Sequence, residues 1–181
     1  MQRILLNEVS KLKQLPHVNQ KTVNEALKRI KSNPRLIKKE NVESHFCSFF
    51  IPIHKESKSI FLVHHIKADD WIPPGGHIEK DELPKQTVIR EFKEELRHEL
   101  TTEIIDCFDI SIKDIADNPR NNCKMHYDLW HVVYVDKLDF IFDKGEFYDA
   151  GWFSFEEGIK KIKTTKYRKI IETLFKTIHL L

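Results

Sequence analysis

The chain has 181 residues, of which 40% are hydrophobic and 32% are charged, and its formal net charge is +2. This length suits one ordinary domain with a small addition and excludes two full domains. The balance of apolar and charged residues, with twelve phenylalanines, excludes a disordered chain. The small net charge gives no general reason to expect nucleic acid or an anionic membrane as a partner.

The cysteines carry no recognisable signature. Cys47, Cys107 and Cys123 are far apart and odd in number, and no CxxC pair is present, so the spacing signals neither a zinc site nor a disulfide framework. No apolar run approaches the roughly 20 residues that span a bilayer. Charges are scattered through residues 1–15, unlike a signal peptide. We therefore expect a soluble cytoplasmic protein with reduced thiols.

Residues 1 to about 33 are predicted to be helical. Apolar residues of the first helix share one face, and Pro16 interrupts the pattern. Thr22 is the candidate N-cap of a second helix, which Asn33-Pro34 ends because the residue before a proline avoids the α region. The apolar positions of the two helices are Ile4, Leu5, Leu12, Leu15, Val23, Ala26, Leu27 and Ile30.

A basic cluster covers the end of the second predicted helix and the polar connection after it. Its members are Lys28, Arg29, Lys31, Arg35, Lys38 and Lys39. A solvated helical face and a polyanion site both remain open, and the solvated face is favoured because charge runs mostly line solvent. The connection divides a predicted N-terminal helical extension (residues 1–40) from one main domain (residues 41–181).

The main domain begins with a predicted β-hairpin. His45–Ile53 and Ser59–His65 are rich in Phe, Ile and Val and are separated by a short polar turn. A helix is predicted over Pro84–Leu96, where the proline suits the first turn. The remaining predictions are strands at about 102–112, 124–135 and 150–153, a helix at about 166–180, and loops at 113–123 and 136–149. This order predicts an α/β (α+β) sandwich with a mixed sheet.

Three glutamates fall on one face of the predicted helix over residues 84–96. At about 100° per residue, Glu91, Glu94 and Glu95 are neighbours. A different, apolar face is predicted for Val88, Ile89, Phe92 and Leu96. Adjacent carboxylates repel one another unless a cation lies among them, and hard oxygen ligands suit Mg²⁺ or Mn²⁺. For the helix alone, a solvated acidic face is the competing interpretation.

The segment before this helix favours the metal-binding interpretation. Glu82 stands six residues after Gly76, and Arg90 stands eight residues after Glu82. The segment resembles the Nudix box, whose spacing is matched here by Gly76, Glu82, Arg90, Glu91, Phe92, Glu94 and Glu95. The similarity covers about residues 45–178 and includes Trp71–Glu79, His126–Leu129 and Gly151–Phe153.

Two positions depart from the box. Arg97 replaces the glycine near the helix end, and His98 replaces the apolar residue after it. That glycine normally forms a left-handed C-cap. Either Arg97 takes this conformation at a cost of about 1 kcal/mol, or the helix continues through His98. Neither position is a metal ligand in the family, so the departures concern the loop rather than catalysis.

The resemblance implies a Nudix-type hydrolase that cleaves the pyrophosphate linkage of a nucleoside diphosphate joined to another moiety, or a related phosphoanhydride. It assigns Glu91 and Glu95 as the principal ligands of Mg²⁺ or Mn²⁺, completed by Glu94 and the carbonyl of Gly76. The metal would neutralise the pyrophosphate and acidify a water that attacks phosphorus. The residues with implied catalytic roles are Glu94, Glu95, Arg90 and Glu146.

Supporting residues are also implied. Arg90 is expected to hold a glutamate by an ion pair, with Glu82 as the favoured partner, and Gly75 lets the backbone approach a ligand closely. Glu146 is the loop candidate for the general base, although an ordinary turn residue remains the alternative. The substrate-binding candidates are His126 and Asp128, which share a strand face with Tyr127 pointing away, and Trp71, which could stack on a base. A core or surface role for His126, Tyr127 and Asp128, and a core role for Trp71, stay open as alternatives.

Three alternatives stay open beside this function. A non-catalytic Nudix module would sense or bind a nucleotide, although such modules typically lose box carboxylates. An isopentenyl diphosphate isomerase would need a cysteine in the segment where Pro74–His77 stands. An unrelated domain would need the matched positions to coincide by chance. The expected partner is a nucleotide-like small molecule, and the N-terminal helices could form a homodimer or cover a cleft.

Overall fold

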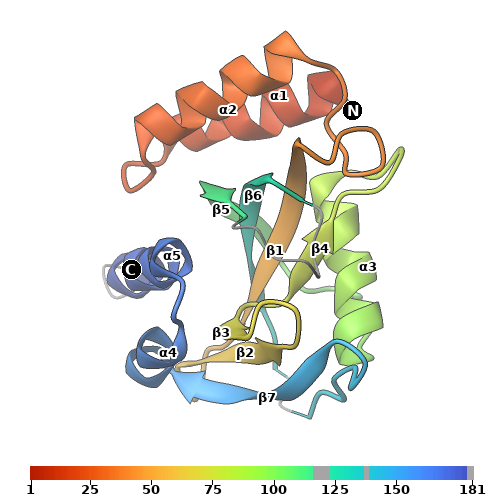
Figure 1. The fold of residues 1–181 in the computed structure, drawn as a ribbon. Coiled ribbons are helices and arrows are strands. Elements are labelled where there is room, and N and C mark those ends of the chain that lie inside the picture. The colour runs from red at the N-terminus through yellow and green to blue at the C-terminus, as the bar shows by residue number, and fades with distance from the viewer. Residues whose placement is uncertain (116–122, 137–138, 179–181) are drawn as a thin grey trace. The chain divides into compact units, whose positions relative to one another are not determined.

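The computed structural model describes residues 1–115, 123–136 and 139–178. It confirms an α/β fold with a mixed seven-stranded sheet (Figure 1). The helices are α1 (Gln2–Lys11), a short 3₁₀ helix (Leu12–Gln14), α2 (Gln20–Ser32), α3 (Pro84–Leu96), α4 (Phe155–Lys161) and α5 (Thr165–Ile178). The strands are β1 (Ser44–His54), β2 (Ser59–His65), β3 (Asp70–Ile72), β4 (Gly75–His77), β5 (Ile105–Asp114), β6 (Met125–Tyr134) and β7 (Phe147–Ser154). The strand order is β3-β2-β1-β6-β5, with β4 paired to β1 and β7 paired to β2.

The chain divides into two compact units. Unit 1 comprises Met1–Phe49, Gly75–Val88 and Cys107–His131, and unit 2 comprises Phe50–Pro74, Ile89–Asp106 and Val132–Leu181. The sequence-based division at residue 40 is a different one, and it stays a prediction. Among the helices of the described ranges, none combines the length and apolar character needed to cross a membrane.

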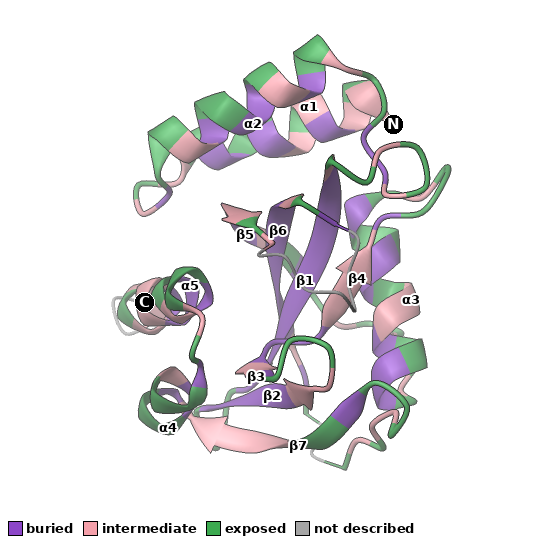
Figure 2. Cartoon of the chain, viewed as in Figure 1, coloured by how far each residue is buried: buried purple, intermediate pink, exposed green. Residues whose placement is uncertain are grey.

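The N-terminal helices of unit 1 lie side by side and bury one face each (Figures 1 and 2). The predicted apolar positions of α2 are all buried, whereas Ile4 and Leu15 are only half-buried. The predicted cap was wrong: Asn19 caps α2, because its Oδ1 accepts hydrogen bonds from the N–H groups of Lys21 and Thr22. The cap therefore lies three residues earlier than predicted, and the helix begins at Gln20.

The core of unit 1 joins these helices to strand residues. Apolar side chains of α1 and α2 share one buried cluster with Phe46, Ile78 and Leu129. Tyr127 stacks on Phe46 in this cluster with ring centroids 5.0 Å apart. The helical extension is thus packed against the strands of unit 1 rather than attached as a free appendage.

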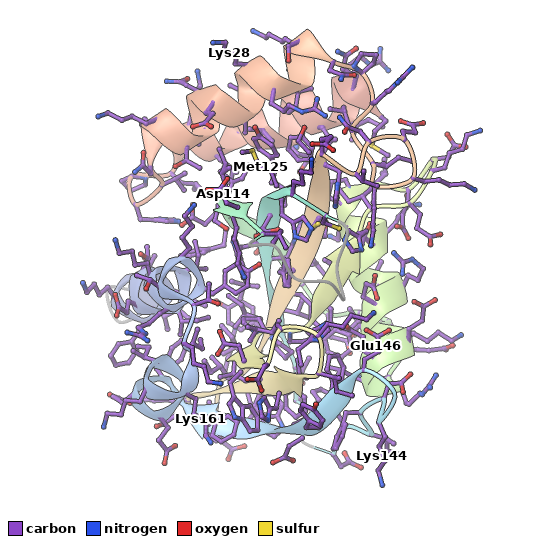
Figure 3. All side chains as sticks on the ribbon, in the orientation of Figure 1. Lys28, Asp114, Met125, Lys144, Glu146 and Lys161 are labelled. Atoms are coloured by element: carbon purple, nitrogen blue, oxygen red, sulfur yellow. The ribbon has the colours of Figure 1, made fainter. Side chains whose placement is uncertain are left out.

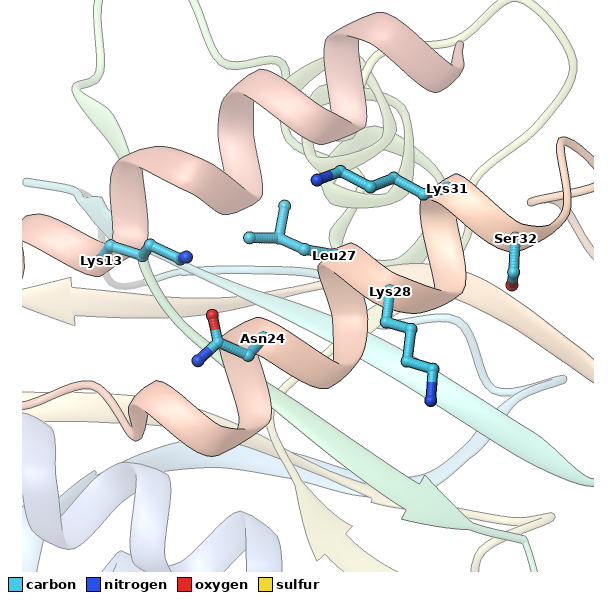
Figure 4. Close-up of a pocket in the computed structure, with 6 residues that line it drawn as sticks. All are labelled: Lys13, Asn24, Leu27, Lys28, Lys31 and Ser32. Atoms are coloured by element: carbon cyan, nitrogen blue, oxygen red, sulfur yellow. The ribbon is translucent and has the colours of Figure 1, made fainter.

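The basic cluster divides into structural and solvated members. Arg29 hydrogen-bonds to Oγ and the carbonyl oxygen of Ser44, each at 2.7 Å, and to the carbonyl of Asn33 at 2.9 Å. It thereby fastens the connection between α2 and β1. The exposed Lys28 and Lys31 border a surface hollow (Figure 4). The residues lining it are Lys13, Asn24, Leu27, Lys28, Lys31 and Ser32. These lysines fit the solvated-face interpretation.

Unit 2 contains the second half of β1, the whole of β2 and the C-terminal helices. β1 and β2 pair antiparallel as predicted, and β2 also pairs with β3 and β7. The buried Asp70 fixes the connection between α4 and α5, because its carboxylate accepts the backbone N–H groups of Lys163 at 2.7 Å and Thr164 at 2.8 Å. Figure 1 shows α4 and α5 side by side.

The predicted boundaries hold best for long periodic segments. α3 has its predicted bounds, and β5, β6 and α5 differ from prediction by a few residues. β7 begins at Phe147, so the end of the predicted loop 136–149 was wrong. α4 was not predicted, although Ser154 and Glu157 form the capping box that begins it. Residues 116–122, 137–138 and 179–180 of the predicted loops and last helix lie outside the described residues.

Asp109→Asn is expected to stabilise the protein at alkaline pH. Burial raises the pKa of Asp109 to about 6, although its Oδ1 accepts the N–H of Ile110 at 2.7 Å. The associated stability is therefore present below about pH 4 and is lost as the pH rises through about 6. The amide should remove this loss, adding about 2 kcal/mol at about pH 8 and little near pH 4. Urea unfolding at both pH values measures the effect, and an equal difference at the two would contradict it.

Candidate functional site

The acidic face of α3 is built as the helical periodicity predicts. Glu95 is 4% exposed, and the Glu91 side chain is 12% exposed, whereas the Glu94 side chain is 57% exposed. The predicted apolar positions Val88, Phe92 and Leu96 are fully buried, but Ile89 is 40% exposed, so its assignment to that face was wrong. Ile89 lies at the edge of the apolar face of α3, where its side chain remains exposed.

Arg90 places a positive charge among these carboxylates. Its Nη1 lies 2.8 Å from Glu91 and 2.9 Å from Glu94. The pKa of Glu91 is raised to about 7, chiefly by burial and further by the charges of Glu94 and Glu146, while Arg90 opposes the rise. The predicted ion pair of Arg90 with Glu82 stays a prediction. The face therefore combines partly buried carboxylates with one guanidinium that orients two of them.

Glu146 is the loop residue that bears on this face. It is exposed and precedes β7, and Figure 3 labels its side chain. Its charge acts on the carboxylate of Glu91. Its backbone is fixed at both ends, because its carbonyl accepts the N–H of Ile66 and its N–H donates to the carbonyl of Asp143. A carboxylate on an anchored loop, open to solvent, has the access that a general base requires.

The structure distinguishes between the two conformations considered for Arg97, which replaces the box glycine. α3 ends at Leu96, and Arg97 itself takes the left-handed conformation with φ of 50°. Asp143 fastens this end, because its N–H donates to the carbonyl of Glu95 at 2.9 Å and its Oδ2 accepts from Arg97 at 3.2 Å. The last carbonyls of a helix have no N–H partner within the helix, and Asp143 supplies one for the carbonyl of Glu95.

Arg97→Gly is expected to stabilise the protein by about 0.5–1 kcal/mol. Glycine removes the left-handed penalty of about 1 kcal/mol, and the lost surface pair with Asp143 offsets it only in part. Arg97→Ala is the matched control, since it loses the pair and keeps the penalty, and it should be neutral or destabilising. Urea unfolding gives both values. Equal stability of the two variants would show that the backbone at this position carries no strain.

The glycine loop of unit 1 precedes α3. Gly75 has φ of 145°, and β4 pairs with β1 so that Gly76 lies opposite Ser48. Glu82 supports the turn after β4, because its Oε2 accepts the N–H of Glu79 at 3.0 Å and the hydroxyl of Thr87 at 2.8 Å. These contacts agree with a supporting role for Glu82 and Gly75.

The three substrate-binding candidates are placed differently. His126 is 6% exposed and Asp128 is fully buried, and they share a face of β6 while Tyr127 points into the helical core, as predicted. Trp71 is half-buried in unit 2, where its ring stacks on His64 with centroids 5.3 Å apart. The ammonium of Lys161 lies 4.5 Å from the Trp71 ring centroid. Burial of His126 and Asp128 favours an internal role over contact with substrate.

A histidine-cysteine cluster in unit 1 escaped the sequence analysis. One ligand atom from each of His45, His77, Cys123 and His126 lies within 4.8 Å of all the others. Burial lowers the pKa of His45 to about 4. Burial and, to a lesser extent, the neighbouring His45 and His77 lower the pKa of His126 to about 2. The Cys-x₂-His spacing of Cys123 and His126 was the signal available, but the other two members come from distant segments.

The donor set on α3 fits a hard divalent cation. Carboxylate oxygens are the ligands that Mg²⁺ and Mn²⁺ prefer. Glu91 is raised in pKa by burial and by two neighbouring carboxylates, and a cation at this face would favour its ionised form. The face therefore carries the ligand type that a hard divalent cation prefers, and the charge of the exposed Glu146 carboxylate acts on it.

Comparisons with known proteins point the same way. The family described as NUDIX domain matches residues 45–174. Dihydroneopterin triphosphate diphosphatase of Haemophilus influenzae is 27% identical over 154 residues, which cover 72% of this chain and 95% of that protein. The E. coli dihydroneopterin triphosphate pyrophosphohydrolase structure has a TM-score of 0.64 at 18% identity, covering 70% of this chain and 92% of that one.

A further structure shows the same fold. A C. elegans Ap4A hydrolase has a TM-score of 0.59 at 18% identity, covering 75% of this chain and 99% of that one. The family match spans most of the chain and includes the glycine loop, the acidic helix and the loop of Glu146. The chain therefore belongs to the Nudix family and is a pyrophosphohydrolase of that family.

Proposed function

We propose that the protein hydrolyses, with Mg²⁺ or Mn²⁺, the pyrophosphate linkage of a nucleoside diphosphate joined to another moiety, or a related phosphoanhydride. The observation that carries the proposal is the partly buried carboxylate face of α3, with Arg90 bonded to two of its members. Burial of like charges is costly unless a cation compensates it. Such a face is therefore better explained by a metal site than by solvation.

The metal ligands in this proposal are Glu91 and Glu95, completed by Glu94 and by the carbonyl of Gly76. The bound metal would neutralise phosphate charge and acidify the attacking water. Arg90 keeps Glu91 and Glu94 oriented through its two short contacts, so these carboxylates need little reorganisation when the substrate arrives.

Glu146→Gln is expected to lower kcat by about 100-fold with little change in KM, since general bases contribute about 10²–10⁴-fold. The exposed Glu146 would accept a proton from the attacking water, and the amide cannot do so. Steady-state kinetics with a substrate found in the panel below measure the effect. Glu156→Gln, an exposed carboxylate on α4, is the control. An unchanged kcat in Glu146→Gln would move the base to Glu94.

A substrate panel tests the proposal. Sugar nucleotides and dinucleoside polyphosphates, whose ends are blocked, would be offered with Mg²⁺ and a coupled phosphatase. Nucleoside triphosphates and dihydroneopterin triphosphate would be offered with Mg²⁺ and a coupled inorganic pyrophosphatase. Dihydroneopterin triphosphate is included because the Haemophilus influenzae and E. coli relatives are named for it. Metal-dependent phosphate release with at least one compound is expected. Tight binding of one compound without turnover of any would favour the nucleotide-sensing alternative instead.

Three further roles inferred from the sequence are also part of this proposal. Stacking of Trp71 on a substrate base, a cytoplasmic location, and dimer formation or cleft covering by the N-terminal helices belong here. The isomerase alternative is disfavoured because the catalytic segment of that reaction would need a cysteine where Gly75 and Gly76 stand, and the described cysteines all lie elsewhere.

A further inference from the structure

The cluster of His45, His77, Cys123 and His126 has the composition of a transition-metal site. The four residues come from β1, from β4, from the residues just before β6, and from β6 itself. Three of them are buried, and the imidazole centroids lie 4.8 Å apart for His45–His126, 5.1 Å for His45–His77 and 5.3 Å for His77–His126. Three imidazoles and one thiol therefore converge on one small volume.

Strand register explains why they converge. In the β1–β4 pair, Cys47 lies opposite His77, so the two side chains share one face of the sheet. His45 is two residues before Cys47 on the same strand and therefore points to that face as well. The backbone pairing therefore places His45 and His77 on the same face of the sheet, whatever rotamers their side chains adopt.

Two buried ring nitrogens in the cluster lack a partner within the described residues. The Nε2 atoms of both His45 and His126 are buried and have no hydrogen bond there. Burying a polar atom without a hydrogen-bond partner is costly, so two such atoms on members of one cluster call for a ligand. A metal ion would satisfy both.

The opposite ring nitrogen of His45 is held as it is in metal sites. Nδ1 of His45 lies 2.9 Å from the carbonyl of Asn41, to which it donates, and this leaves the lone pair on Nε2. Nδ1 of His126 lies 3.8 Å from the carboxylate of Asp128, which is beyond hydrogen-bond distance. Metal-binding histidines characteristically give their second nitrogen to a carbonyl or a carboxylate, which fixes the tautomer and the ring orientation.

We infer that His45, His77, Cys123 and His126 form a closed, structural site for a zinc-like divalent ion, distinct from the carboxylate face of α3. Zinc favours four nitrogen and sulfur ligands in a tetrahedron, with bonds of about 2.0–2.3 Å. Ligand atoms are then about 3.3–3.7 Å apart. The Cys123 Sγ to His77 Nε2 distance is already 3.6 Å, and the remaining atoms, within 4.8 Å, need only small movements.

The donor chemistry separates this site from the proposed catalytic one. Imidazole and thiolate favour zinc and other later transition metals, whereas carboxylates favour Mg²⁺. Four protein ligands leave no open position for a substrate, so the ion would be structural. It would tie β4, which carries Gly76, to the first strand and to β6 within unit 1.

Two competing explanations need to be separated by experiment. A thiol–imidazole hydrogen bond between Cys123 and His77 would account for their contact without a metal. A second group, Cys47, His126 and Asp128, also has ligand atoms within 4.8 Å of one another. Both groups contain His126, so the two cysteines discriminate between them.

The test measures bound zinc directly. The full chain would be purified without a metal-affinity tag, incubated with zinc, dialysed against excess Mg²⁺, and analysed by inductively coupled plasma mass spectrometry. We expect zinc at a one-to-one ratio in the unmodified protein, in Cys47→Ser and in Glu95→Gln, and its loss in Cys123→Ser. Chelation should lower Tm in the unmodified protein and leave Tm of Cys123→Ser unchanged.

Several results would overturn the inference. These are absence of stoichiometric zinc from the unmodified protein, retention of zinc by Cys123→Ser, and loss of zinc from Cys47→Ser. If Cys123→Ser does not fold, cobalt replaces zinc in Cys47→Ser, where a thiolate-to-cobalt charge-transfer band supports Cys123 as the ligand and its absence refutes it. Retention of zinc by Glu95→Gln keeps this outcome separate from the fate of the proposed hydrolase.

Discussion

Glu95→Gln is expected to abolish metal-dependent turnover, lowering kcat by about 10³-fold or more, while the protein remains folded. Loss of one preorganised charge-stabilising group commonly costs about 10²–10³-fold. A carboxylate ligand should cost at least as much, because the amide neither carries the charge nor holds the ion as firmly. The effect concentrates on Glu95 because it is the most buried carboxylate of the face, at 4% exposure.

The fold should survive this change for a separate reason. Glutamine has nearly the shape of glutamate, and the contact that fastens the end of α3 uses the backbone carbonyl of residue 95, which accepts the N–H of Asp143 at 2.9 Å. Circular dichroism and urea unfolding check this, and phosphate release checks turnover. Glu56→Gln, in the exposed turn between β1 and β2, is the matched control and should keep full activity. Full activity of Glu95→Gln would refute the metal assignment.

Gly75→Ala is expected to destabilise the protein by about 3 kcal/mol or more, a large part of the roughly 5–15 kcal/mol typical of a domain. At φ of 145° a side chain is strained, and a Cβ there would lie 2.5 Å from both the Cα of Phe49 and the carbonyl oxygen of Ser48. These are backbone atoms of β1, so the clash cannot be relieved by rotating a side chain. The antiparallel pair of β4 with β1 must separate.

Gly151→Ala is the control for this substitution. A Cβ at Gly151 in β7 would meet the ring of Phe153 at 3.6 Å, an ordinary van der Waals contact. Its effect should stay within about 1 kcal/mol. The urea midpoints and slopes of both variants measure the difference. Equal stability of Gly75→Ala and the unmodified protein would mean that β4 does not approach β1 as closely as the structure has it.

The predictions that succeeded rest on local periodicity. The bounds of α3, the hairpin of β1 and β2, and the buried positions of α2 follow from apolar spacing and turn residues, which act over a few residues. The acidic face of α3 belongs to the same class, since the spacing of Glu91, Glu94 and Glu95 fixes their common side. The exposure of the three glutamates could not be predicted in this way. It depends on the packing around α3, which buries Glu95 and leaves Glu94 open to solvent.

The predictions that failed concern positions at which the sequence allows more than one outcome. Thr22 and Asn19 are both acceptable caps, and in the structure the side chain of Asn19 accepts the N–H groups at the start of α2. Ile89 suited an apolar face, but the stripe that packs is narrower than the periodicity allows. β4 is too short for a pattern, and its pairing with β1 makes it a strand.

The sequence by itself determined the family, the carboxylate helix and the helical extension, because each depends on residues that are close together in the chain. Only the tertiary structure decided that Arg97 adopts the left-handed conformation and that Asp143 fastens it. It also decided that His45 and His77 meet the Cys123–His126 pair. The physical reason is that strand register joins residues far apart in the chain, and no local spacing records which strands will pair.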